Sequence, residues 1–330
     1  MTPADLSLTV QHAVRRAVDD GALRVDVPPR VKVERARPGG TGEYASSVAL
    51  SLARPAGRTP LDVAGVLKER LQGVPGILAV DITGPGFLNF TLRPDAGGDL
   101  VRAIRDEGAA YGHGTALAGT TVRFAEVTES RGQVVTGVVL RLLRSQGADA
   151  SFGGGERMHV RPAAYLPDVL GVDAARWALL RAAPSDRALD GPPLLLQHER
   201  NSLFRVRYAH ARVQRLLVNG LQLGFTPSYA YGIPSETSYE SDLLASELLG
   251  VLGDHPLVLL AAARHRAPDR VARHLEATAD ALLAFQHTVL PLGDEKPSAA
   301  HRSRLALAEA AGTVLAGGLA LLGISAPDQI

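Results

Sequence analysis

The segment over 199–218 carries the side chains best suited to contact a polyanion. Arg205, Tyr208, Arg212 and Arg215 follow one another at steps of three or four residues, so a helix would place them along one side. A second stripe with the same spacing is largely apolar and consists of Leu203, Val206, His210, Val213 and Leu217. The two stripes lie about 200° apart on a helical wheel. One face is therefore predicted to pack, while the other presents guanidinium and phenol groups that suit phosphates and unpaired bases.

A solvated helix face in an Arg-rich chain accounts for the same pattern. Only Lys32, Lys68 and Lys296 are lysines among the 35 basic residues, which indicates a compositional bias rather than a dedicated guanidinium site. The 34 acidic residues leave a net charge of +1, unlike the strongly basic domains typical of nucleic-acid binders. His210 lies within the apolar stripe and is predicted to be a packed core histidine.

Other catalytic or metal-binding patterns are weak. The chain has no Cys, which excludes disulfides, thiolate nucleophiles and thiolate metal sites. Gly153-Gly154-Gly155 lacks the Lys-Ser/Thr end of a P-loop and predicts a flexible joint. Glu126 and Glu129 are interpreted as a solvated pair. None of the ten His residues has the spacing of a metal site, so we predict no metal and no cofactor.

The sequence pattern predicts an α+β fold in three parts, whose helices and strands would position the residues above. Residues 1–110 read as a small α/β domain, with helices from Thr2 and over 42–53 and 60–72, and strands over 76–82 and 87–92. Residues 111–192 predict a short βα connector with one strand–helix–strand piece. Residues 193–330 predict an all-α helical bundle. No apolar run of membrane-spanning length and no signal peptide are expected, so we predict a cytoplasmic protein without a membrane partner.

Several short segments resemble arginyl-tRNA synthetases, in the family's own order. The Tyr-Ala-His-Ala-Arg core within 202–212 resembles the DALR-type anticodon-binding helix, and Gly84-Pro85-Gly86 with the strand after it resembles the additional N-terminal domain. The matching segments are 42–49, 84–90, 171–177, 202–212, 289–293, 304–307 and 321–327. The resemblance implies an N-terminal additional domain over 1–110 and an anticodon-binding bundle over 193–330.

The resemblance also implies where tRNA would be contacted. The N-terminal domain would meet the D-arm side, with Phe87 stacking on a base and Asn89 reading a base edge. The bundle would meet the anticodon loop through Arg205, Tyr208, Arg212 and Arg215. Because alternate residues of a strand face opposite sides, one of Phe87 and Phe90 is expected only to pack. Arginine acceptors are the tRNAs that the family implies.

The middle of the chain departs from the family. A class I catalytic core needs a nucleotide-binding sheet with a His-x-Gly-His motif and a Lys-Met-Ser-Lys-Ser-like loop, and 120–165 is too short for two Rossmann halves. Glu156-Arg157-Met158-His159-Val160 stands in place of that loop and has no Lys. Without those groups nothing familiar stabilises charge on a transferring phosphate. We therefore predict a truncated core remnant over 111–192 and a pseudoenzyme that binds tRNA.

Two alternatives stay open at the level of sequence. The scaffold could serve as a protein-interaction or regulatory module without RNA binding, docking on a protein partner or forming a homo-oligomer, and the near-neutral charge favours this reading. Residual arginine–tRNA ligase activity is the less favoured alternative, since it requires the motifs that the middle of the chain lacks.

Overall fold

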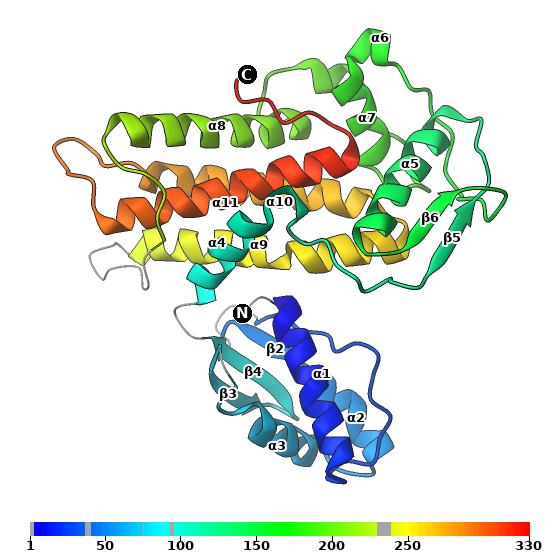
Figure 1. The fold of residues 1–330 in the computed structure, drawn as a ribbon, viewed down its shortest axis with the longest axis vertical. Helices are drawn as coiled ribbons and strands as arrows, with labels where there is room; N and C mark the ends of the chain where they lie inside the picture. Colours follow the sequence, from blue (N-terminus) through cyan, green and yellow to red (C-terminus); the bar gives the residue numbers. More distant parts are fainter. Residues whose placement is uncertain (1–2, 37–40, 75, 93–95, 230–238) are drawn as a thin grey trace. The chain divides into compact units, whose positions relative to one another are not determined.

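The computed structural model describes residues 3–36, 41–74, 76–92, 96–229 and 239–330 (Figure 1). The chain divides into two compact units, Met1–Leu100 and Val101–Ile330. The mixture of a small sheet-containing unit and a helix-rich unit confirms the predicted α+β class. The three-part division at 110 and 192 stays a prediction.

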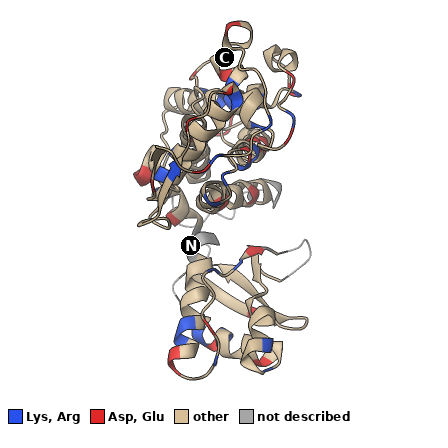
Figure 2. Ribbon diagram, turned by 90° about the vertical axis from the view of Figure 1, so that its right-hand side faces the viewer, with Lys and Arg blue, Asp and Glu red and all other residues tan. Residues whose placement is uncertain are grey.

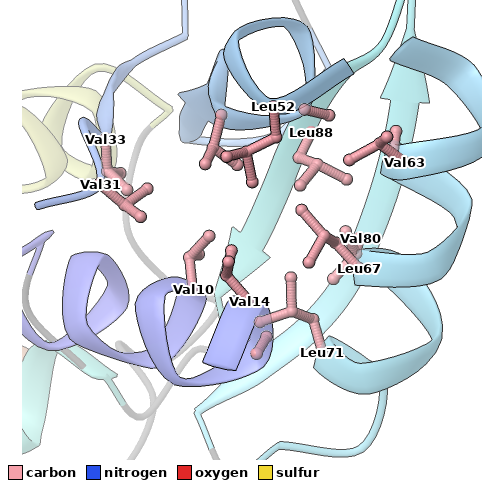
Figure 3. Close-up of a cluster of buried hydrophobic side chains, with 14 of the residues drawn as sticks. Val10, Val14, Val31, Val33, Leu52, Val63, Leu67, Leu71, Val80 and Leu88 are labelled. Atoms are coloured by element: carbon pink, nitrogen blue, oxygen red, sulfur yellow. The ribbon is translucent and has the colours of Figure 1, made fainter. Parts of the chain in front are cut away.

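The first unit is a four-stranded antiparallel sheet with helices on one face (Figure 1). Its strands, β1 (Glu34–Arg35), β2 (Tyr44–Ser46), β3 (Ile77–Thr83) and β4 (Phe87–Leu92), lie in the order β1-β2-β4-β3. Its helices are α1 (Pro3–Asp19), α2 (Val48–Ala56) and α3 (Pro60–Leu71). Apolar residues of α1 and α3 meet those of β3 and β4 in one buried cluster, which includes Val10, Val14, Leu67, Val80 and Leu88 (Figure 3).

The predicted helix over 42–53 is wrong at its beginning. Tyr44–Ser46 is strand β2, and the helix begins only at Val48. The cause is pairing with strand β4, because the Glu43 N–H donates to the Phe90 carbonyl at 2.8 Å. Gly42 (φ +75°) approaches β4 so closely that a Cβ there would lie 2.5 Å from the Phe90 oxygen. Long-range pairing therefore outweighs local helix propensity here.

The second unit combines a two-stranded parallel sheet with a helical bundle. β5 (Thr121–Phe124), α5 (Ser130–Ser145) and β6 (Asp149–Phe152) form the predicted strand–helix–strand piece. The short elements α6 (Pro167–Leu170), α7 (Val172–Leu180) and η2 (Pro192–Leu195) lead to the bundle. The bundle helices are α8 (Ser202–Gln222), α9 (Tyr239–His265), α10 (Asp269–Phe285) with η3 (Gln286–Thr288), and α11 (Ala299–Leu322). α4 (Ala96–Glu107) and η1 (Gly108–Ala110) precede β5.

The segment that follows β6 pairs with the carboxyl end of the outer edge of β5. Glu156 N–H donates to Arg123 O, and Ala125 N–H donates to Glu156 O, each at 2.9 Å. Gly155 lies so close to β5 that a Cβ would meet the Arg123 oxygen at 1.7 Å. The triglycine run predicted as a flexible joint is therefore an ordered edge segment that only glycine permits at position 155.

A fully buried guanidinium organises the connector. Arg131 donates to the backbone carbonyls of five residues at 2.6–3.4 Å, namely Arg161, Leu179, Ala182, Ala183 and Asp186. These residues belong to the end of α7 and to irregular segments, where carbonyls lack a regular ladder. Because an unpaired buried carbonyl is costly, one side chain satisfies a whole stretch of irregular backbone.

Glu129, the N-cap residue of α5, stabilises the same region. Its carboxylate accepts from the N–H groups of Arg131 (3.0 Å), Gly132 (2.6 Å) and Ala163 (3.0 Å). Burial alone would raise the pKa of Glu129, but these three donors and the Arg131 charge hold the pKa below its ordinary value. The predicted solvated pair is thus half wrong, because only Glu126 is exposed.

Two helices bear on the expectation that no apolar run could span a membrane, although one or two such helices are weak evidence for a span. Leu243–His265 and Ala299–Leu322 are long and apolar enough by length and composition. Most of the second lies buried within the bundle, as expected of a core helix. The absence of a membrane partner stays a prediction.

Replacing Arg131 by Met should destabilise the second unit by about 3 kcal/mol or more, because several buried carbonyls lose their donor at once. The readout is urea unfolding followed by the fluorescence of Trp177, the one tryptophan, which is buried in this unit. Arg264→Met, at an exposed position near the end of α9, serves as the control. Equal losses in both variants would show that Arg131 does not organise the connector.

Two buried histidines should make the second unit acid-sensitive. The rings of His255 and His274 lie 5.1 Å apart, and burial lowers the pKa of His274 to about 4 and that of His255 well below its ordinary value. The unfolded chain binds protons at these two histidines near pH 6.5, whereas the folded protein does so only near pH 4 or below. The unfolding free energy is therefore highest above about pH 6.5 and falls as the pH drops toward about 4. His274 alone predicts a loss of about 2 kcal/mol in unfolding free energy between pH 7 and pH 5.

The measurement is urea unfolding at both pH values, again read from Trp177. His274→Gln should flatten the pH dependence, whereas His287→Gln, at an exposed position on η3, should leave it unchanged. The same slope in wild type and His274→Gln would contradict this assignment.

Candidate nucleic-acid interface

Helix α8 begins at a well-defined cap and carries most of the predicted contact residues. Asn201 accepts from Phe204 N–H at 3.2 Å, and its amide donates to the carbonyls of Leu194 (2.9 Å) and Leu196 (2.8 Å). Asn201 is buried, and its side chain fixes where the helix begins. Trp177 Nε1 donates to Ser202 Oγ at 3.0 Å and joins α7 to this end of α8.

The predicted packed face of α8 is confirmed. Leu203, Val206 and Val213 are buried in the bundle. His210 is buried with them, and its Nδ1 donates to the Pro327 carbonyl at 3.0 Å, so it is the packed histidine that the apolar stripe predicts. At Gly312 on α11, a Cβ would lie 2.9 Å from a Val213 methyl carbon, which shows how closely the two helices approach.

The opposite face exposes a pair of rings. Tyr208 is 40% exposed, and the half-buried Phe204 ring stacks on it with centroids 5.6 Å apart and planes 20° apart. Sequence reasoning missed Phe204, although its position four residues before Tyr208 places both rings on one side of a helix. The two rings form a short aromatic surface open to solvent.

Two of the three predicted arginines are tied to neighbouring helices. Arg205 Nε lies 3.0 Å from Asp280 Oδ1 on α10, and Arg212 Nε donates to Gln286 Oε1 on η3 at 2.6 Å. Both guanidinium groups are half-buried. Arg215 is exposed, and no residue within the described ranges bonds to it. Of the three predicted arginines on this face, only Arg215 has a guanidinium group without a partner among the described residues. The face therefore presents two rings and this one guanidinium group.

Positive and negative side chains lie close to one another in much of the described chain, as Arg205 and Asp280 do. Basic and acidic segments are interspersed in both units (Figure 2). This agrees with the net charge of +1 and with the pairing of Arg205 to Asp280.

In the first unit the predicted residues lie on β4, just after the turn. Phe87 is 38% exposed, whereas Phe90 is fully buried, so the expected division between the two rings is confirmed. Asn89 is 6% exposed, and its amide donates to Thr83 Oγ1 at 2.7 Å and to Phe87 O at 3.4 Å. Asn89 thus fixes the β3–β4 turn that displays Phe87. Its role as a base reader stays a prediction.

Two of the resembling segments, far apart in sequence, fold against each other. Arg176 on α7 donates from Nε and Nη2 to the Leu322 carbonyl at the end of α11, both at 3.1 Å. Asp173 accepts from the Ser325 N–H at 3.0 Å and from its hydroxyl. Residues 171–177 and 321–327 therefore form one structural joint next to the start of α8.

The comparisons with known proteins agree with this architecture. The arginyl tRNA synthetase N terminal domain family matches residues 6–92, and the DALR anticodon binding domain family matches residues 206–330. The chain is therefore arginyl-tRNA synthetase-like and carries both of these domains.

Its relatives include complete ligases. The arginine–tRNA ligase of Frankia alni is 26% identical over 555 aligned positions, covering all of both chains. That of Micrococcus luteus is 43% identical over 166 residues, which are 46% of this chain and 30% of the relative. Among solved structures, Thermus thermophilus arginyl-tRNA synthetase matches with a TM-score of 0.72 at 13% identity, covering all of both chains. The Plasmodium falciparum enzyme matches with a TM-score of 0.68 at 8% identity, covering 99% of each chain.

The prediction of a pseudoenzyme is contradicted by these relatives. Proteins that align with the full chain are arginine–tRNA ligases, which points to an enzyme. The prediction rested on two missing motifs and on a segment, 120–165, that is too short for two Rossmann halves. Charge on a transferring phosphate can be stabilised by any correctly placed cation or donor, and a motif search does not test that geometry.

The two faces of α8 should respond differently to truncation. Leu203→Ala removes buried apolar contacts and should lower the unfolding free energy by about 2–4 kcal/mol. Arg215→Ala changes an exposed side chain and should stay within about 0.5 kcal/mol of wild type. Urea unfolding read from Trp177 compares them, and similar losses would mean that the faces are wrongly assigned.

Proposed function

We propose that this protein binds tRNA, with arginine acceptors as preferred partners, through the exposed face of α8 and the β3–β4 turn. The observation that carries the proposal is the stacked Phe204–Tyr208 ring pair on α8, with the exposed Arg215 two turns further along the helix, which the anticodon-binding domain match covers from residue 206. Exposed stacked rings are the usual platform for unpaired RNA bases.

Each contact residue then has a distinct role. Tyr208 stacks on an anticodon-loop base and Arg215 contacts a neighbouring phosphate. Arg205 and Arg212 hold α8 against α10 and η3, and so orient the rings in addition to contributing charge. In the N-terminal domain Phe87 supplies a second stacking ring for the D-arm side, with Asn89 holding the turn.

The setting that we propose is cytoplasmic translation, as for the ligases to which the chain is similar. Because full-length relatives attach arginine to tRNA, aminoacylation is the second candidate function. Arginine-dependent exchange of pyrophosphate with ATP measures it directly. Turnover above background would support that activity, and its absence would leave tRNA binding as the function to test.

Recovery of tRNA from the total cellular pool tests the main proposal, at about 0.15 M salt where surface charge is realistically screened. Sequencing should find arginine acceptors enriched. Few free cations predict a shallow salt dependence, about 0.7 in log–log slope for each single-strand phosphate contacted. Failure to retain any tRNA would overturn the proposal and favour a protein-interaction module instead.

Tyr208→Ala should weaken tRNA binding by about 1–3 kcal/mol, the contribution of one base stack. Tyr208→Phe keeps the ring and should bind nearly as well as wild type. Both are compared by filter binding with arginine-acceptor tRNA, after Trp177 fluorescence has shown that each variant is folded. Equal affinity of Tyr208→Ala and wild type would remove Tyr208 from the interface.

A further inference from the structure

The connector carries a large share of the exposed apolar side chains. Of the eighteen large hydrophobic residues that are exposed within the described ranges, six lie between residues 166 and 196. They belong to α6, α7, η2 and the residues next to these elements. Exposed apolar patches rimmed by polar residues mark interaction sites. We call this surface the connector face and define it by Leu166, Val169, Val172, Leu189, Leu195 and Leu196.

Two hollows give the connector face its shape. One has a volume of about 620 Å³ and lies between α6 and residues 187–192, and the other, of about 500 Å³, lies between η2 and the start of α8. Leu170 and Leu195 line both hollows, so the apolar surface continues from one to the other. α6 projects from the rest of the second unit, and its Val169 is 68% exposed (Figure 1). The face therefore combines an apolar projection with apolar hollows beside it.

The walls of the larger hollow are fixed by close contacts within the second unit. The Leu189 N–H donates to the Ala178 carbonyl at 2.9 Å, which joins one wall to α7. Gly191 passes so close to α6 that a Cβ there would lie 2.6 Å from a methyl carbon of Leu170. Because a surface that is already ordered loses little conformational entropy on binding, this face is suited to a partner.

Two charged side chains of opposite sign flank the apolar residues. Arg161 lines the larger hollow, and Asp168 precedes Val169 on α6. Both are exposed, and neither side chain bonds to another residue in the part of the chain that the structure describes. In a two-fold symmetric contact each pair of residues occurs twice, so Asp168 of each copy can meet Arg161 of the other. The connector face is therefore complementary in charge to itself.

We propose that the connector face binds the same face of a second copy of the chain, as an isologous dimer. Val169 of each copy fills the larger hollow of the other, and Arg161 pairs with Asp168 across the contact. A net charge of +1 leaves little long-range repulsion between two copies. The connector face shares no residue with the proposed tRNA contacts on α8 and β4, so the proposal is independent of the proposed function.

Sedimentation equilibrium of the full chain, over about 1–100 µM of protein, measures this association directly. Wild type should form a dimer whose fraction rises with concentration. Val169→Ser should raise the Kd of the dimer about tenfold or more, because a symmetric contact loses this apolar side chain twice. Val218→Ser is the matched control, since Val218 is also an exposed valine on a helix but lies on α8, outside the connector face.

Charge reversal tests the pairing between the two copies. Asp168→Arg and Arg161→Glu should each raise the Kd about tenfold, because each places like charges opposite one another at two symmetric positions. The double variant Asp168→Arg/Arg161→Glu restores opposite charges and should recover most of the wild-type affinity. A variant weakened by misfolding would not be rescued in this way.

Tyr208→Ala alters the proposed tRNA contact and should dimerise like wild type, so loss of tRNA binding and loss of the dimer are observed separately. A wild type that stays monomeric over the whole concentration range would overturn the proposal, as would a dimer that Val169→Ser weakens no more than Val218→Ser. Co-sedimentation of a monomeric wild type with a full-length arginine–tRNA ligase would assign the connector face to that partner and equally overturn it. Equal losses in the single and double charge reversals would contradict the pairing of Arg161 with Asp168.

Discussion

The arrangement of the second unit depends on the hydrogen bonds from the buried guanidinium group of Arg131 to backbone carbonyls. A charge in the interior needs compensation, and here the compensation comes from backbone carbonyl dipoles and from nearby Glu129. Burial lowers the pKa of Arg131, yet an arginine stays charged under all ordinary conditions. The positive charge is thus a permanent centre around which irregular backbone can fold.

A series of polar contacts connects Arg131 through α7 to the candidate interface on α8. Arg131 holds the carbonyl of Leu179 near the end of α7. α7 in turn reaches α10 through Arg181 and Glu276 (2.6 Å), the end of α11 through Arg176, and the start of α8 through Trp177. The rings on α8 are therefore displayed by a framework of named polar contacts as well as by apolar packing.

Arginines that bond to distant parts of the chain also explain one difference between prediction and structure. The two faces of α8 were predicted correctly from the sequence, but the number of unpaired arginines on its polar face was not. The apolar stripe and the Phe87–Phe90 division follow from local periodicity, which a single sequence contains. The partners of Arg205 and Arg212 lie on α10 and η3, more than 70 residues away, and spacing along one helix cannot reveal them. Tyr44–Ser46 escaped prediction for the same reason, because its partner strand β4 is distant in sequence. Glu129 is different, since two of its three donors, the N–H groups of Arg131 and Gly132, lie in the first turn of α5 and only that of Ala163 is distant.

The pairing at the carboxyl end of the β5 edge has a consequence for how the chain avoids edge-to-edge pairing with other copies of itself. An open strand edge is a template for intermolecular pairing. Glu156 covers this end of the edge and is held there by Arg266, which immediately follows α9. Protection against aggregation is thus coupled to bundle assembly, because the ion pair that secures Glu156 forms only once the end of α9 has docked beside the sheet.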